Sequence, residues 1–308
     1  MNDLKARNMT KQINLDGTTS VSAVETIVGR SGDLEHKARR AMKYMVRAIQ
    51  EHEPDEIFVG FSGGTDSLLC ADLLLRHFPE AKIFHANTGI GLSKTRQYVR
   101  DICKRKEWDL VEIRAREDCG QDYEEIVMKH GFPGPAMHTR MYARLKERCV
   151  RELHRRYKKK RGSKIMLVTG IRHDESRIRA GYKNSIISVN GGVVWVNAFY
   201  WFTQQDKYDY IKSRDLEVNP VHKVIGMSGE CLCGAYAHEG ELDLIRIVEP
   251  ETADYIEKLQ ERVMKKWPWG WEDSMPKWFS ALKEGQTEAF YDWEESEYFQ
   301  PMCVGCGK

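Results

Sequence analysis

Short apolar runs alternate with amphipathic stretches through the middle of the chain, and this pattern predicts the fold. Five runs are expected to form buried strands, at 57–61, 82–86, 110–113, 165–169 and 193–196. Amphipathic helices are expected at about 34–51, 66–77, 93–107, 139–160, 201–213 and 249–266. Because strands that alternate with helices form parallel sheets with right-handed crossovers, the sequence predicts an α/β fold with a Rossmann-like, five-stranded parallel sheet.

The turn after the first strand is the most specific motif of the chain. It consists of Ser62, Gly63, Gly64, Thr65, Asp66 and Ser67. Adjacent glycines tolerate positive φ and let the backbone approach a ligand closely. Amides and hydroxyls of such a turn point into a concavity at a helix N-terminus, which attracts anions. We therefore expect a nucleotide phosphate site, the alternative being a turn capped in the ordinary way by Ser and Asp. It is not a Walker A loop, because no Gly-Lys-Ser/Thr follows.

Two more polar turns follow strands of the same predicted sheet. The second strand ends at Asn87, Thr88 and Gly89, and the fourth is followed by Gly170, Arg172, Glu175 and Arg177. Ligands of parallel sheets bind beyond the carboxyl ends of the strands, where all three turns should meet. The two arginines suit recognition of phosphates. A surface cluster of ion pairs is the alternative for this last string.

Charge and hydropathy narrow the class of protein. The 308 residues carry a formal net charge of +2, so net charge alone predicts no polyanionic partner. The helix at 139–160 is dense in Arg and Lys, and either contacts nucleic acid or presents a solvated face. With no apolar run of signal-peptide or transmembrane length, the chain is expected to be soluble and cytoplasmic, without a membrane partner.

The chain has eight cysteines, which in a cytosolic protein indicate thiol or metal chemistry rather than a disulfide framework. Cys231 and Cys233 form a Cys-x-Cys motif, and Cys303 and Cys306 form a distant Cys-x-x-Cys. Four such thiolates could hold zinc or an iron–sulfur cluster, and the spacing does not choose between them. A redox-active pair or idle core cysteines are the alternatives. Cys149 is an alternative ligand, or else a buried free thiol.

These features divide the chain into three parts. An N-terminal extension and helix is expected over 1–55, a nucleotide-binding domain over 56–215, and a small C-terminal cysteine-cluster segment over 216–308. The last part is also rich in tryptophan, with Trp267, Trp269, Trp271, Trp278 and Trp293. Tryptophan rings could stack on bases, but we expect them to form a small core around the cluster.

In these motifs, residues of about 56–235 resemble the phosphoadenosine phosphosulfate reductase family of the adenine nucleotide α-hydrolase, or PP-loop, superfamily. The Ser62–Ser67 turn matches the pyrophosphate loop, Asn87-Thr88-Gly89 matches an Asp-Thr-Gly segment, and Gly170 to Arg177 matches a Gly-x-Arg-x-x-Glu-Ser string. Asn219-Pro220 ahead of Cys231 resembles the Asn-Pro stretch before the cluster cysteines, and Cys149 sits where iron–sulfur members carry their first ligands.

The chain also departs from the reductase pattern. Asn87 replaces the usual Asp, Lys94 stands where a Glu is common, and the Glu-Cys-Gly-x-His motif that carries the reductase nucleophile is absent. The loop has the full Ser-Gly-Gly-x-Asp-Ser form of ATP-cleaving members. This combination resembles the ATP pyrophosphatases of DNA phosphorothioate modification.

That resemblance implies an enzyme that adenylates an acceptor with ATP and Mg²⁺ for sulfur transfer. The Ser62–Ser67 loop would hold the phosphates, Asp66 would orient Mg²⁺, and Arg172 and Arg177 would neutralise charge. The cysteines would carry an iron–sulfur cluster, of the [4Fe-4S] type, with zinc as the alternative. The implied partners are DNA, a cysteine desulfurase or other sulfur donor, and a second copy of the chain as a homodimer. Two other functions stay open: an adenylylsulfate reductase with Cys303 or Cys306 as its thiol, and a non-catalytic ATP-binding subunit.

Overall fold

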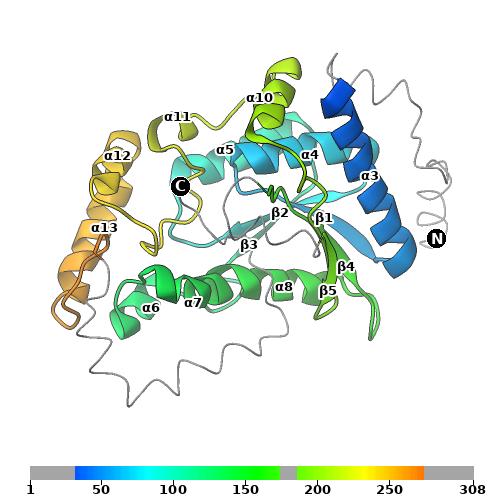
Figure 1. Cartoon of the computed structure of the whole chain (residues 1–308). Coiled ribbons are helices and arrows are strands. Elements are labelled where there is room, and N and C mark those ends of the chain that lie inside the picture. Colours follow the sequence, from blue (N-terminus) through cyan, green and yellow to red (C-terminus); the bar gives the residue numbers. More distant parts are fainter. Residues whose placement is uncertain (1–31, 174–185, 274–308) are drawn as a thin grey trace.

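A single six-stranded sheet forms the centre of the computed structural model, which describes residues 32–173 and 186–273 (Figure 1). The strand order is β3-β2-β1-β4-β6-β5. The strands are β1 Glu56–Gly60, β2 Lys82–Asn87, β3 Leu110–Arg114, β4 Ile165–Val168, β5 Ile187–Asn190 and β6 Val193–Val196. Neighbours pair in parallel from β3 across to β6, whereas β5 is antiparallel to β6. The α/β fold and its five parallel strands are confirmed.

The prediction of five strands misses β5, which is one of the two edge strands of the sheet. Its sequence, Ile-Ser-Val-Asn, alternates apolar and polar residues, so it lacks the continuous apolar run by which the five parallel strands are predicted. It joins β6 through Gly191 and Gly192, whose φ angles are 54° and 86°. Two successive residues with positive φ suit a two-residue hairpin turn, and glycine adopts that conformation without a steric cost.

Helices cover both faces of the sheet, because side chains alternate between its two faces along each strand. Ile57 and Val59 of β1 pack in one core with α3 Gly32–His52, α4 Thr65–His77, α5 Ser93–Arg105 and α10 Gln204–Ser213. Phe58, between them, packs in the other core with α6 Tyr123–His130, α8 Arg148–Tyr157 and α13 Pro250–Val263. In Figure 1, α3 lies along the sheet, whereas α13 lies at the side of the molecule beside α6.

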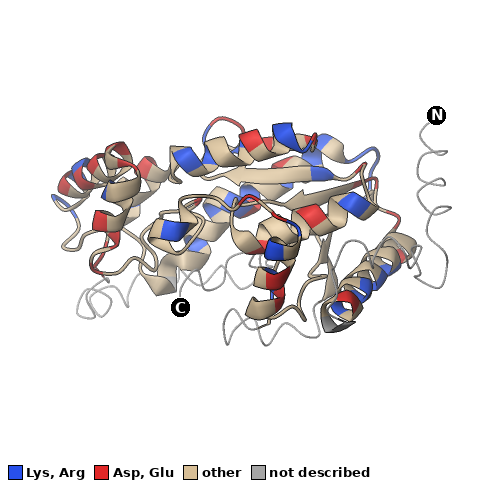
Figure 2. Ribbon diagram, turned by 90° about the horizontal axis from the view of Figure 1, so that it is seen from above, with Lys and Arg blue, Asp and Glu red and all other residues tan. Residues whose placement is uncertain are grey.

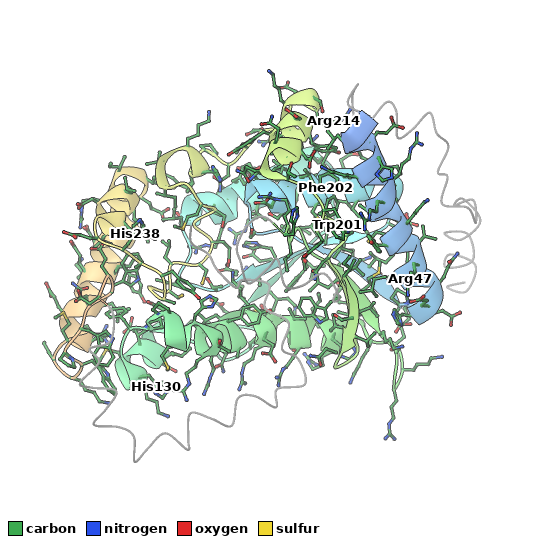
Figure 3. The ribbon with its side chains drawn as sticks, in the orientation of Figure 1. Arg47, His130, Trp201, Phe202, Arg214 and His238 are labelled. Carbon is green, nitrogen blue, oxygen red and sulfur yellow. The ribbon has the colours of Figure 1, made fainter. Side chains whose placement is uncertain are left out.

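Helix α3 belongs to the first of these cores although it precedes the sheet in the chain. Its buried side chains include Met42 and Met45, in one cluster with Val194 and Val196 of β6. The guanidinium carbon of Arg40 lies 4.1 Å from the ring centre of Trp201. Trp201, labelled in Figure 3, lies in the segment before α10. This cation–π contact fastens α3 to that segment.

The basic stretch predicted as one helix over 139–160 is built in several pieces. A 3₁₀ turn, η1 Pro135–Met137, leads into α7 His138–Tyr142, a π-helical turn, η2 Ala143–Glu147, and then α8, which ends at Tyr157. Arg155 and Arg156 both pair with Glu152, and Arg156 also pairs with Asp118 at 2.6 Å. Figure 2 shows acidic residues interspersed with basic ones along the helices. The paired arginines favour a solvated face over a nucleic-acid stripe.

The C-terminal part of the described chain is helical and packs on α6. The helix predicted over 249–266 is α13, which begins at Pro250, a favoured first-turn residue, and ends at Val263. Two helices outside the predicted set, α11 His222–Ile225 and α12 Glu241–Val248, precede it. Among the helices of 32–173 and 186–273, none has the length and apolar character that crossing a membrane requires.

Three of the tail tryptophans are core residues, but they belong to the large core on one face of the sheet rather than to a small core of their own. Trp267, Trp269 and Trp271 are all buried. The indole N–H of Trp269 donates to the Phe132 carbonyl at 2.8 Å, and that of Trp271 donates to the Leu232 carbonyl at 3.0 Å. Each ring thus buries its apolar surface while its polar edge keeps a partner. Trp278 and Trp293 lie outside the described residues.

Candidate functional site

The Ser62–Ser67 loop connects β1 to α4 and presents the N-terminal end of that helix. Gly63 has a φ of 77°, and Gly64 is the N-cap residue of α4, where no side chain of the described residues caps the helix. The Ser67 hydroxyl donates to the Gly64 carbonyl at 2.9 Å and accepts from the Ser62 amide at 3.3 Å. The first amides of a helix have no acceptor within it, and the helix dipole makes that end positive. The loop is therefore braced internally and can receive an anion.

Gly63 has little room for a side chain, in addition to having a positive φ angle. A Cβ atom at this position would lie 3.0 Å from Cγ2 of Thr95 and 3.2 Å from Cγ2 of Val99. The loop therefore rests directly on the first turns of α5. Thr65 and Ser67 are themselves buried, so this part of the loop packs against the protein interior.

Asp66, in the first turn of α4, carries the carboxylate of the site. It accepts a hydrogen bond from Nε of Arg172, in the turn after β4, and lies 3.5 Å from Nζ of Lys207 on α10. The two cationic side chains are only 3% and 4% exposed, whereas Asp66 is 26% exposed. Gln204 accepts a further hydrogen bond from Arg172 at 2.7 Å. The structure thus holds two buried cations beside the Ser62–Ser67 loop, which we call the phosphate loop after its predicted role.

The turn after β4 contacts the start of α4 through Gly170. A Cβ atom on Gly170 would lie 2.7 Å from the Asp66 carbonyl oxygen, closer than such atoms approach in proteins. Glycine is therefore needed for Arg172 to reach Asp66. Glu175, Ser176 and Arg177, for which the sequence predicts a share in phosphate recognition, lie outside the described residues.

The predicted turn Asn87-Thr88-Gly89 lies at the carboxyl end of β2, beside the phosphate loop strand. The side-chain oxygen of Asn87 accepts from the Gly89 amide at 3.1 Å, and its amide nitrogen donates to Glu112 at 2.7 Å. Arg100 donates two hydrogen bonds of 2.8 Å to the same Glu112. Partial burial favours the neutral acid, but the hydrogen bonds from Arg100 and Asn87 outweigh it and lower the pKa of Glu112 to about 2. An asparagine fits here because it can donate to this carboxylate.

We expect Asn87→Asp to lower the free energy of unfolding at pH 7 by about 1–3 kcal/mol. The new carboxylate would face that of Glu112 and replace the hydrogen bond between Asn87 and Glu112 with a repulsion. One of the two must then have a raised pKa in the folded protein, so the loss should shrink as the pH falls through that pKa. Urea unfolding at pH 7 and pH 4 measures this. The double variant Asn87→Asp/Glu112→Gln, which reverses donor and acceptor, should regain most of the stability; equal losses in both variants would contradict the explanation.

A segment far along the chain packs against this turn and against the start of α5. The Leu92 amide donates to the Gly229 carbonyl at 2.8 Å, and the Leu232 amide donates to the Ile90 carbonyl at 3.1 Å. The Thr88 hydroxyl donates to the Glu230 carbonyl at 2.9 Å. We call residues 228–233 the docked segment. It carries the Cys-x-Cys motif to the carboxyl edge of the sheet.

Asn219 and Thr95 fix the beginning of the docked segment. The Thr95 hydroxyl donates to the Ser228 carbonyl at 2.5 Å and accepts from the Asn219 side chain at 3.1 Å. A Cβ atom on Gly64 would touch Cβ of Ser228 at 3.4 Å. The Asn219-Pro220 stretch singled out in the sequence therefore lies beside the phosphate loop.

A buried ion pair joins the docked segment to the π-helical turn. Nζ of Lys146 lies 2.8 Å from Oε2 of Glu230, and the two side chains are 12% and 3% exposed. Burial alone would lower the pKa of Lys146, but the nearby carboxylate raises it. A π-helical turn such as the one that carries Lys146 is often found at a functional site.

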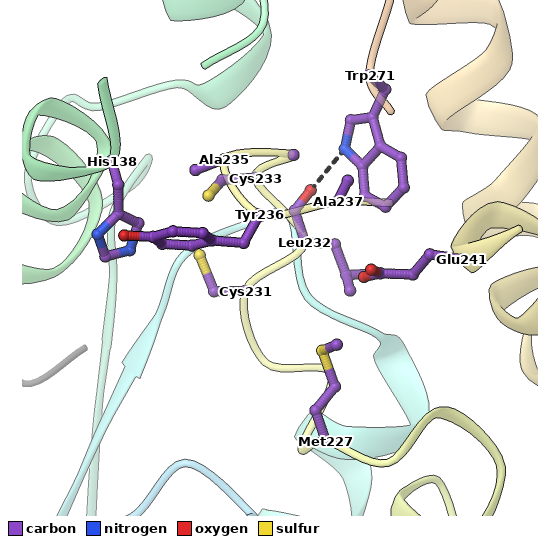
Figure 4. Close-up of a pocket in the computed structure, with 11 residues that line it drawn as sticks. His138, Met227, Cys231, Leu232, Cys233, Ala235, Tyr236, Ala237, Glu241 and Trp271 are labelled. Carbon is purple, nitrogen blue, oxygen red and sulfur yellow. Dashed lines mark hydrogen bonds between the residues drawn. The ribbon is translucent and has the colours of Figure 1, made fainter. Parts of the chain in front are cut away.

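Cys231 and Cys233 lie together in the docked segment, and they line a small cavity of about 30 Å³ with His138 and Tyr236 (Figure 4). The rings of His138 and Tyr236 contact each other at an angle of 54°, with centres 4.9 Å apart. The neighbouring Cys233 thiol, together with burial, raises the pKa of Cys231. The proximity of the Cys231 thiol, against the effect of burial, lowers the pKa of Cys233.

The other cysteines of the predicted ligand set are placed differently. Cys303 and Cys306 lie outside the described residues. Cys149 is buried in α8, and its sulfur is 3.9 Å from that of Cys119. Within 32–173 and 186–273, no three His, Cys, Asp or Glu side chains are grouped closely enough to hold a metal ion. The Cys231–Cys233 pair could thus supply two ligands of a larger set.

Sequence reasoning misses Lys207, Lys146 and Glu230. Lys207 lies in a helix whose local pattern is that of a surface helix, and only the packing of α10 against α4 brings it to Asp66. Lys146 is one of many cations in a basic run. The only local signal is at Glu230, a carboxylate directly before the Cys-x-Cys motif.

The chain matches the model of the phosphoadenosine phosphosulfate reductase domain over residues 56–225, more than half of its length. It therefore belongs to that family. A probable sulfurtransferase of Methanocaldococcus jannaschii is 34% identical to it over 96 residues, which are 29% of this chain and 28% of that protein. The aligned part thus spans well under two thirds of the relative.

Solved structures with low similarity to this chain include a reductase and a thiolase. Phosphoadenylyl-sulfate reductase of Candida auris, in a phosphate complex, has a TM-score of 0.44 at 14% identity, covering 64% of this chain and 93% of that one. The U34-tRNA thiolase NcsA of Methanococcus maripaludis, with its [4Fe-4S] cluster, has a TM-score of 0.43 at 13% identity, covering 76% and 79%.

Proposed function

We propose that the protein is a nucleotide-binding enzyme of sulfur transfer, and more narrowly an ATP pyrophosphatase that adenylates an acceptor. The main support is that the N-terminus of α4 has no side-chain cap from the described residues and that Arg172 and Lys207 are buried beside it, both contacting Asp66. Such a site offers amides and two cations to a chain of phosphates. Membership of the reductase family and the similarity to a probable sulfurtransferase support the sulfur-transfer part.

In this mechanism the loop amides and the two cations hold the β- and γ-phosphates. An acceptor oxygen attacks the α-phosphorus, the bond between the α-phosphorus and the bridging oxygen breaks, and pyrophosphate leaves with the electron pair. Stabilising the charge on that leaving group is the contribution of Arg172, Lys207 and the helix end. A sulfur nucleophile then displaces AMP from the adenylated acceptor. DNA as the acceptor and a cysteine desulfurase as the sulfur donor belong to this proposal through the family resemblance.

Two cofactors are part of the proposal. Mg²⁺ would accompany ATP, and Asp66 is the carboxylate within reach of the loop; it would have to exchange part of its contact with Arg172 and Lys207 for the ion. Cys231 and Cys233 fit two positions of a [4Fe-4S] or zinc site, and Cys303 and Cys306 are proposed for the others. When bound, the cluster would hold the sulfur to be transferred.

The test is to purify the protein without oxygen and to measure pyrophosphate release from ATP–Mg²⁺ with duplex DNA or tRNA, in parallel with sulfite release from adenylylsulfates. We expect pyrophosphate and no sulfite. Sulfite without pyrophosphate would overturn the proposal and identify a reductase. ATP binding by calorimetry with neither product would instead favour a non-catalytic ATP-binding subunit.

A further inference from the structure

Cys119 and Cys149 form a second pair of thiols, distinct from Cys231 and Cys233. Cys119 lies in the turn after β3, and Cys149 lies in the first turn of α8, yet their sulfur atoms are 3.9 Å apart. A disulfide requires about 2.05 Å, so closure needs an approach of about 2 Å. The Cys149 thiol also contacts the Leu145 carbonyl at 3.2 Å, which directs it along the helix surface.

The two thiols differ in their access to solvent. Cys149 is fully buried, whereas Cys119 is partly exposed in a turn whose neighbours Arg116, Glu117 and Gly120 are exposed. Gly120 has a φ of 62°, and a Cβ atom added there would meet no other atom within 4 Å, so this end of the turn is open. The turn, rather than the packed helix, can therefore supply the movement that closure needs.

We propose that Cys119 and Cys149 are a dithiol site that closes to a disulfide by exchange with a small-molecule disulfide. Cys119, as thiolate, attacks one sulfur of the reagent, forming a mixed disulfide and releasing the first thiol. Cys149 then attacks the Cys119 sulfur, its proton passes to solvent, and the second thiol leaves. Two protein thiols are oxidised and one reagent disulfide is reduced to two thiols.

This site has a consequence for the metal ligands. A sulfur joined to Cys119 is not available as a ligand, so closure would exclude Cys149 from any cluster and leave the pair outside the sulfur-holding set. Closure would also tie the turn after the edge strand β3 to α8, directly after the π-helical turn that carries Lys146. The inference concerns oxidation chemistry alone and does not depend on the proposed ATP reaction.

The test uses the folded full-length protein, incubated with oxidised glutathione, blocked with iodoacetamide and digested with trypsin. Cleavage at Arg116, Lys129, Arg148 and Arg151 gives peptides 117–129 and 149–151, and we expect them joined by a disulfide. Cys149→Ser should accumulate glutathione on Cys119. Cys119→Ser should abolish the joined peptide and leave Cys149 unmodified.

Cys103→Ser is the matched control, since Cys103 is a buried free thiol of α5, and the joined peptide should form in it at the wild-type yield. A wild-type protein that keeps glutathione on Cys119 without forming the joined peptide would overturn the inference. So would a Cys149→Ser variant in which Cys119 stays unmodified. Near-wild-type circular dichroism of each variant keeps these results from being attributed to unfolding.

Discussion

Asp66→Ala is expected to lower the rate of pyrophosphate release by about 100-fold or more, the scale seen when one preorganised electrostatic group is removed from an active site. Asp66 holds Arg172 and Lys207 together beside the phosphate loop. Without its charge the two buried cations repel each other and lose the position that phosphates require. Steady-state rates with ATP–Mg²⁺ as the varied substrate measure the loss.

The fall in Asp66→Ala should appear mainly in kcat, because the loop amides still bind ATP. Asp66→Asn, which keeps the shape and a hydrogen-bond acceptor for Arg172, should retain more activity than alanine. Asp209→Ala is the matched control, since Asp209 is exposed on α10 and bonds to Gln205 on the same helix. If Asp66→Ala and Asp209→Ala were equally active, the role assigned to Asp66 would be wrong.

Breaking the Lys146–Glu230 pair is expected to cost about 3–5 kcal/mol of unfolding free energy, because each single substitution leaves an uncompensated charge in the core. Lys146→Met and Glu230→Gln are the variants, with urea unfolding as the measurement. The double variant Lys146→Met/Glu230→Gln should be less destabilised than the sum of the two, since it leaves no buried charge.

Arg155→Met provides the control for this pair. Its guanidinium is exposed, and its partner Glu152 keeps Arg156, so the loss should stay within about 1 kcal/mol. If Lys146→Met were no more harmful than Arg155→Met, the pair would contribute little to stability. A loss of iron or zinc content in Lys146→Met without a loss of stability would point instead to a direct role at the cysteines.

The five parallel strands and the turn at Ser62–Ser67 could be predicted because their signals are local. An apolar run such as Ile57–Phe61 has to be buried, and two glycines between a strand and a helix restrict the backbone to few conformations. Helix α12 could not be predicted because no side chain of the described residues caps its start. It begins after Gly240, which adopts a left-handed conformation. A typical start signal is therefore absent.

The rest of the site depends on contacts between distant segments. Lys207 reaches Asp66, and Glu230 reaches Lys146, only after α10 and the docked segment have packed on the sheet. Nothing in the residues next to Lys146 distinguishes it from the exposed cations of the same run. A buried charge can be recognised by its partner, and the partner is a property of the tertiary structure.

The docked segment also determines how this part of the molecule can open. Its backbone forms hydrogen bonds with Ile90 and Leu92, and the Ser228 carbonyl accepts a hydrogen bond from Thr95. Thr95 also packs against Gly63 of the phosphate loop. Local unfolding that exposes Cys231 and Cys233 to solvent must break these bonds and remove one wall of the loop in the same event. The amides of 229–232 should therefore exchange their hydrogens together with those at the start of α5, as a single cooperative unit.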